Sequence, residues 1–185
     1  MNDTTMGFEL STIDLAWIDG SSYNPDDLCL HGHVKVRIGD SILDDGTGGP
    51  WCVSAGAYRF LQSLHDDHPS AMASSSLGFE NHLMPCCGHF MYIDEPSDQL
   101  VIIECQNGID WSCIHEGSDV RLGADGMHDV VLPLTQYAQV VFDFADAVSA
   151  FYQCCSPKRP QHDGVTDVAF TRFWADWQQL RDDPL

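Results

Sequence analysis

Two histidines in this sequence have the spacing to share a metal ion. His31 and His33 are separated by one residue, so on an extended strand both imidazoles lie on the same face. A cupin-type site also needs a carboxylate a few residues later, where this chain has Lys35 and Arg37. Two cations beside the imidazoles oppose metal binding. We therefore expect an exposed strand face here and keep a metal site as the alternative.

A second group of possible metal ligands follows Pro85. Cys86, Cys87 and His89 place three soft ligands within four residues, and such side chains are suitable ligands for zinc. A structural zinc site usually combines two such groups, and the sequence offers no second one. We expect buried thiols here. A metal-binding protein or enzyme that uses His31/His33 or Cys86/Cys87/His89 remains the alternative function.

The sequence contains no complete catalytic motif. There is no G-x-S-x-G nucleophile elbow and no Gly-rich phosphate loop, and the glycines of residues 46–49 run into Pro50, which has no N–H donor. A cysteine nucleophile needs a lowered thiol pKa, whereas dense negative charge raises it. We therefore expect no enzymatic activity, no catalytic residue and no cofactor.

Charge is the most unusual property of the chain. Eight Lys and Arg stand against 28 Asp and Glu, giving a formal net charge of −20. This excess argues against nucleic-acid binding, which needs basic side chains, and against anionic membranes. It is compatible with a basic protein partner, with cation binding or with a saline habitat, and a surface that merely keeps the chain soluble is an equal alternative. The imbalance is greatest over residues 71–150, where Arg121 is the only base.

The acidic middle of the chain therefore supplies the candidate partner-binding residues. Trp111 is included because tryptophan is common at binding hot spots, although a core position for this ring is an equal alternative. The other candidates are carboxylates on both sides of it. The predicted partner-binding set is Asp94, Glu95, Asp98, Asp110, Trp111, Glu116 and Asp119.

Hydrophobic periodicity predicts the elements that position these residues. Alternation over residues 28–38 predicts a strand, and helical spacing predicts helices over 51–66, 134–154 and 168–181. Ser54 and Asp167 are the expected caps of the first and last helices. Residues 89–133 read as an antiparallel meander with a hairpin turn at Asn107-Gly108. Residues 44–50, 66–81 and 156–165 read as loops.

Strands in the middle with helices before and after them favour an α+β fold. We expect an antiparallel sheet packed on one face by about three helices, and one domain over residues 1–185. No signal peptide and no apolar run of bilayer-spanning length are visible in the sequence. These features predict a soluble cytoplasmic protein with reduced cysteines.

The layout resembles the small acidic immunity proteins that bacteria encode beside secreted or contact-delivered toxins. The resemblance rests on three segments. These are the predicted meander around Cys86–Glu116, the segment Val131–Tyr137 that leads into a predicted helix, and the aromatic residues Phe173, Trp174 and Trp177 near the C-terminus. Immunity families differ in fold, so the resemblance transfers no site residues. It implies a protein that binds and neutralises a cognate toxin, often a basic nuclease, without catalysis.

Overall fold

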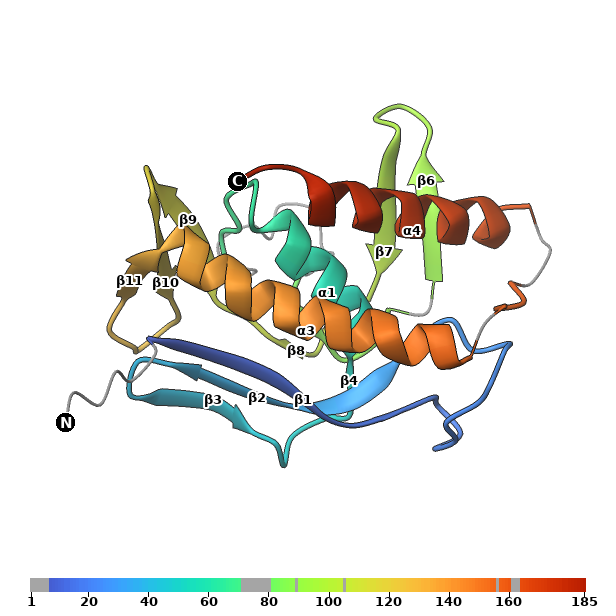
Figure 1. The fold of residues 1–185 in the computed structure, drawn as a ribbon, viewed down its shortest axis with the longest axis horizontal. Helices are drawn as coiled ribbons and strands as arrows, with labels where there is room; N and C mark the ends of the chain where they lie inside the picture. Colours follow the sequence, from blue (N-terminus) through green and yellow to red (C-terminus); the bar gives the residue numbers. More distant parts are fainter. Residues whose placement is uncertain (1–6, 71–80, 89, 105, 156, 161–163) are drawn as a thin grey trace.

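The computed structural model describes residues 7–70, 81–88, 90–104, 106–155, 157–160 and 164–185 (Figure 1). Its strands pair antiparallel and its helices precede and follow them along the chain. The α+β class predicted from the sequence is therefore confirmed. In the described part of the chain, no helix combines the length and apolarity needed to cross a membrane.

The largest sheet is formed by the N-terminal part of the chain. Its strands are β1 (Phe8–Ala16), β2 (His31–Ile38), β3 (Ser41–Asp45) and β4 (Trp51–Cys52), with β2 between β1 on one side and β3 and β4 on the other. Along β2 the residues alternate as predicted, because Val34, Val36 and Ile38 are buried while Lys35 is exposed. The buried face turns toward the helices.

In the described part of the chain, three helices cover this sheet and the smaller ones. They are α1 (Val53–Gln62), α3 (Leu134–Cys154) and α4 (Thr166–Asp182). Figure 1 shows the sheet below α3 and α4 above it, while α1 contacts both of these helices. The observed bounds of α3 are those predicted from its apolar stripe. The helix contacts α1 and β1.

The two predicted helix caps are wrong. Trp51 and Cys52 form β4, so α1 begins at Val53 with Cys52 as its N-cap residue. Ser54 lies inside the helix, where its hydroxyl oxygen accepts a hydrogen bond from the Leu30 N–H at 3.1 Å. At the last helix the N-cap residue is Val165, and Asp167 lies in the first turn.

The predicted meander is divided among three smaller sheets. β6 (Phe90–Asp94) pairs with β7 (Gln99–Ile103), and β5 (Met84–Pro85) pairs with β8 (Gly108–Ile109). Among the described strands, only β9 (Ser112–Glu116), β10 (Asp119–Gly123) and β11 (Val130–Pro133) form a meander. The fold class therefore holds, but the prediction of one continuous meander is wrong.

The hairpin predicted at Asn107-Gly108 is also wrong. β7 pairs with β6 and β8 pairs with β5, so this dipeptide does not join two paired strands. Gly108 does not adopt a positive φ, and it is needed for a different reason. A Cβ atom there would lie 2.4 Å from Cγ of His82, so glycine lets two chain segments approach closely.

The predicted loop at residues 66–81 lies largely outside the described residues, as does part of the loop at 156–165.

Candidate functional site

The acidic candidates of the middle segment lie at two separate places. Asp94, Glu95 and Asp98 lie at the β6–β7 hairpin, and Glu116 and Asp119 face each other at the β9–β10 hairpin. Figure 1 shows β9 and β10 at the left of the molecule and the β6–β7 hairpin projecting at the upper right. These described carboxylates therefore form two groups that come from different sheets.

Trp111 and Asp110 do not lie on the surface that we predicted for partner binding. Trp111 is 0% exposed, and its ring stacks on Phe60 at a centroid distance of 5.4 Å. The Asp110 carboxylate accepts a hydrogen bond from the Leu83 N–H at 2.9 Å and bonds to Nε2 of His68 at 3.0 Å. Both side chains are used to hold the fold together.

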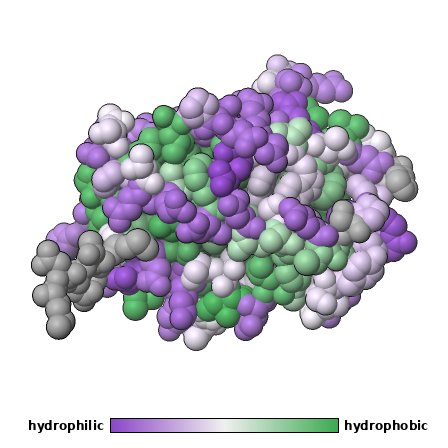
Figure 2. Space-filling model, in the orientation of Figure 1, coloured by the Kyte–Doolittle hydropathy of each residue, from purple (hydrophilic) through white to green (hydrophobic). Residues whose placement is uncertain are grey.

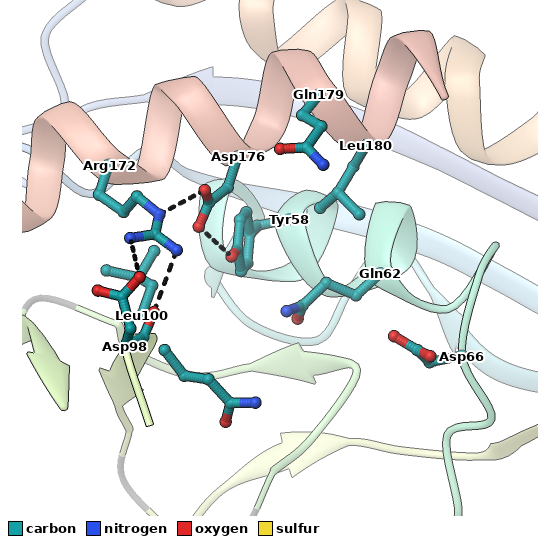
Figure 3. A pocket seen from close by; sticks show the side chains of 10 residues that line it. Tyr58, Gln62, Asp66, Asp98, Leu100, Arg172, Asp176, Gln179 and Leu180 are labelled. Atoms are coloured by element: carbon teal, nitrogen blue, oxygen red, sulfur yellow. Dashed lines mark hydrogen bonds and ion pairs between the residues drawn. The ribbon is translucent and has the colours of Figure 1, made fainter. Parts of the chain in front are cut away.

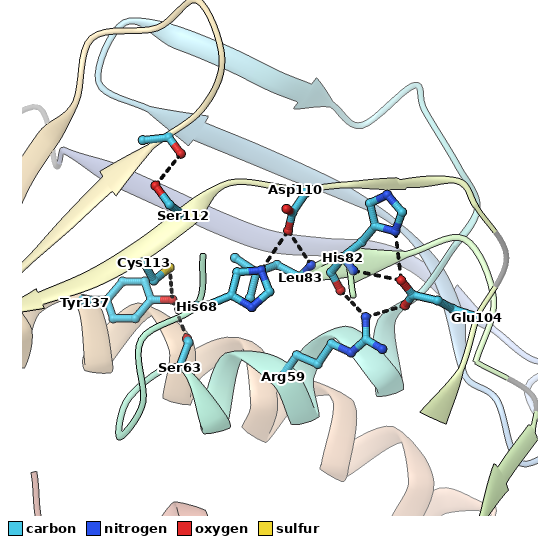
Figure 4. Close-up of polar contacts among 11 residues, drawn as sticks. Arg59, Ser63, His68, His82, Leu83, Glu104, Asp110, Ser112, Cys113 and Tyr137 are labelled. Carbon is cyan, nitrogen blue, oxygen red and sulfur yellow. Dashed lines mark hydrogen bonds and ion pairs between the residues drawn. The ribbon is translucent and has the colours of Figure 1, made fainter. Parts of the chain in front are cut away.

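Glu104 is a further carboxylate of the middle segment that is buried. Its side chain is 1% exposed and accepts a hydrogen bond from the His82 N–H at 2.8 Å (Figure 4). It also bonds to Nδ1 of His82 at 2.9 Å and to the Arg59 guanidinium. Burial lowers the pKa of Arg59, and the neighbouring Glu104 charge opposes that shift. The pair therefore holds residue 82 onto α1.

Tyr137 and Cys113 extend this buried polar region beyond His68. The Tyr137 hydroxyl lies 2.8 Å from Oγ of Ser63 and 3.2 Å from Sγ of Cys113. Burial raises the pKa of Cys113 to about 12, so its thiol stays protonated near neutral pH. This arrangement lacks the activated nucleophile that covalent catalysis needs.

A cavity of about 510 Å³ lies between α1, α4 and the β6–β7 hairpin (Figure 3). Its walls carry three carboxylates, one guanidinium, one phenol and several amides. The lining residues are Tyr58, Gln62, Asp66, Asp98, Gln99, Leu100, Arg172, Asp176, Gln179 and Leu180. Of the predicted partner-binding residues, Asp98 is the one that lines this cavity.

Arg172 organises one wall of the cavity. Its Nε donates to Asp176 at 2.6 Å, its Nη1 donates to the Asp98 carboxylate at 3.3 Å, and its Nη2 donates to the Asp98 carbonyl at 3.1 Å. Hydrogen bonds to Asp176 and the charge of that carboxylate raise the pKa of Arg172. Because the guanidinium bridges α4 and the hairpin, it fixes Asp98 at the cavity rim.

Tyr58 completes this wall from α1. Its hydroxyl donates to Asp176 at 3.3 Å, and burial together with the Asp176 charge raises the pKa of Tyr58 well above its usual value. The phenol is therefore a neutral donor. Figure 3 shows Asp66 on the side of the cavity opposite Asp98. With one guanidinium against three carboxylates, the lining has a surplus of two negative charges.

All six arginines of the chain are paired with carboxylates of the chain itself. Two of them, Arg121 and Arg172, each hold two carboxylates. The remaining pairs are Arg37–Glu9, Arg59–Glu104, Arg159–Asp26 and Arg181–Asp146. The six guanidiniums are thus all paired within the chain.

Sequence reasoning missed the part played by Arg172. Asp176 follows it by four residues on a helix, a spacing that was visible in the sequence and that predicts an ion pair. The contact of Arg172 with Asp98 joins residues 74 positions apart, so no local sequence pattern predicts it.

The structure describes most, but not all, of the residues that we considered as alternative metal ligands. His31 and His33 share a strand face as predicted, and Nδ1 of His33 bonds to the Gly48 carbonyl oxygen. Cys86 and Cys87 are half-buried, whereas His89 lies outside the described residues. Over the residues that the structure describes, no three His, Cys, Asp or Glu side chains are grouped to hold a metal ion.

Comparisons with known proteins found no relative. No protein-family model matches the chain, and no curated protein and no solved structure is significantly similar to it.

Proposed function

We propose that this chain is a non-catalytic binding protein that neutralises a basic protein toxin, as the immunity proteins it resembles do. The observation that carries this proposal is the cavity between α1, α4 and the β6–β7 hairpin, whose walls keep two surplus negative charges in a chain of net charge −20. We call it the acidic cavity. Its volume lies in the range of cavities that take ligands, and its lining suits Lys or Arg side chains.

Electrostatics gives such a surface two uses. The overall charge attracts a cationic partner from a distance and raises the association rate, up to ~10⁸–10⁹ M⁻¹s⁻¹ at low salt. Asp66 and Asp98 then provide short-range partners for its basic side chains, and Asp98 is well placed because it is 79% exposed. A toxin that acts on nucleic acid must itself carry a cationic surface to hold phosphates.

Co-expression tests this function. The toxin in the experiment is the secreted or contact-delivered protein encoded beside this chain in its own genome, expressed in bacteria under an inducible promoter. We expect growth to be restored when the chain is co-expressed, and the two proteins to purify as one complex. Continued growth arrest despite a folded chain, or the lack of a basic toxin gene beside it, would refute the proposal.

A further inference from the structure

Two buried cysteines lie close together beside the start of α1. The sulfur atoms of Cys29 and Cys52 are 3.6 Å apart, although the residues are 23 positions apart in the chain. Their side chains pack with Ala55 and Ile102 in a small cluster of their own, and the two cysteines are 3% and 0% exposed. The pair therefore connects the segment before β2 to the junction of β4 and α1.

The surroundings favour a negative charge on Cys52. It is the N-cap residue of α1, where the helix presents free N–H groups and the positive end of its dipole. The hydrogen bond between the two thiols lowers the pKa of Cys52, and the Ala55 N–H and the Arg59 charge act in the same direction. That same contact and burial raise the pKa of Cys29. Cys52 is thus the better nucleophile of the two.

Neighbouring segments close over the pair. A Cβ atom on Gly88 would lie 3.2 Å from Sγ of Cys52 and 2.8 Å from Cβ of Ala55, so residue 88 rests directly on this cluster. On α3, the Tyr152 hydroxyl donates to the Leu28 carbonyl at 2.6 Å. Because these contacts cover the sulfurs, a reagent reaches them only when this part of the fold opens.

We propose that Cys29 and Cys52 are a disulfide-forming pair that locks the segment before β2 to the start of α1 when the chain meets a small disulfide such as oxidised glutathione. In the first step the Cys52 thiolate attacks the glutathione disulfide and releases one glutathione thiolate. In the second step Cys29 gives its proton to a released thiolate and attacks the Cys52 sulfur, which releases the second glutathione. Two protein thiols are oxidised and one glutathione disulfide is reduced.

The geometry requires only a small movement to form this bond. The sulfurs must approach from 3.6 Å to the bond length of about 2.05 Å. Exchange is slow in the closed fold and faster during refolding, and the finished disulfide is shielded from reductants by the same cover. The bond would close a long loop and so disfavour the unfolded chain. This inference does not depend on the proposed function.

Peptide mapping tests the pair directly. The full chain is refolded in oxidised and reduced glutathione, alkylated under denaturing conditions and digested without reductant. We expect one cross-linked peptide pair that joins Cys29 to Cys52, and a rise of the urea midpoint by roughly 1 M that is lost when the chain is reduced under denaturing conditions and refolded with reductant. Fully alkylated thiols, or a link between other cysteines, would overturn the proposal.

Variants supply the control. Cys29→Ser and Cys52→Ala should each abolish the oxidative rise in the urea midpoint, whereas Cys154→Ser, which changes an exposed thiol at the end of α3, should retain it. A rise that persists in folded Cys29→Ser would contradict the pairing. If a variant does not fold, the cross-linked peptide of the unchanged chain still decides the question.

Discussion

At the scale of single residues, carboxylates of the same chemical type have opposite roles in this chain. The buried side chain of Glu104 and the half-buried side chain of Asp110 hold residues 82 and 83, while Asp66 and Asp98 remain open to solvent at the acidic cavity. The sequence showed all of them as equal contributions to the negative charge. Burial depends on which segments meet in space, so it could not be predicted from residue type or local spacing.

This difference predicts the effect of two matched substitutions. Glu104→Gln leaves the Arg59 charge buried without its counterion, and should lower the free energy of unfolding by about 3–5 kcal/mol. Glu116→Gln also removes a carboxylate partner of an arginine, but this pair is exposed and Arg121 keeps Asp129, so the loss should change the stability little. Urea denaturation of both variants measures the contrast. Equal effects would show that the Glu104 pair is not the buried ion pair described.

At the scale of elements, a helix or strand could be predicted where its hydrophobic pattern lies within one continuous segment of the sequence. The α3 helix was predicted with its observed boundaries because its apolar residues recur along one continuous segment, and β2 was predicted because its residues alternate. The pairing of β8 with β5 was missed because each strand has two residues and they come from distant segments. Asn107-Gly108 fits a hairpin locally, but the contact of Gly108 with His82 explains the glycine.

The close approach at Gly108 leads to a prediction for this element. Alanine there would place its Cβ 2.4 Å from Cγ of His82 and displace the ring that bonds to Glu104. We expect Gly108→Ala to lower the free energy of unfolding by about 2–4 kcal/mol. Gly126→Ala is the control, because a Cβ there meets open space and only the positive φ is strained. An effect no larger than that of the control in urea denaturation would argue against the contact.

At the scale of the whole molecule, the described acidic candidates lie at more than one place, because the β6–β7 hairpin, the β9–β10 hairpin and the acidic cavity each carry some of them. Figure 2 shows hydrophilic residues across much of one side, with apolar patches between them. The net charge was available from composition alone and predicts attraction of a cation. The acidic cavity, where we propose that a cationic partner docks, could not be predicted from composition, because it joins residues of α1, α4 and the β6–β7 hairpin.

The central claim is that a cationic partner docks at this cavity, and two charge-matched double variants test it. Asp66→Asn with Asp98→Asn removes two cavity charges, and asparagine tolerates the positive φ of residue 98. Asp40→Asn with Asp125→Asn removes two exposed charges elsewhere. Both variants have the same net charge, so bulk attraction alone would affect them equally.

The deciding measurement is the association rate and the dissociation constant of these proteins with an inactivated form of the proposed basic toxin, at low and high NaCl. We expect the rate for the unchanged chain to fall at least about tenfold between roughly 50 and 500 mM NaCl, because salt screens the attraction. The cavity variant should bind at least about tenfold more weakly than the control variant, since it loses short-range ion pairs as well. Salt-independent association, or equal binding by the two variants, would contradict the account.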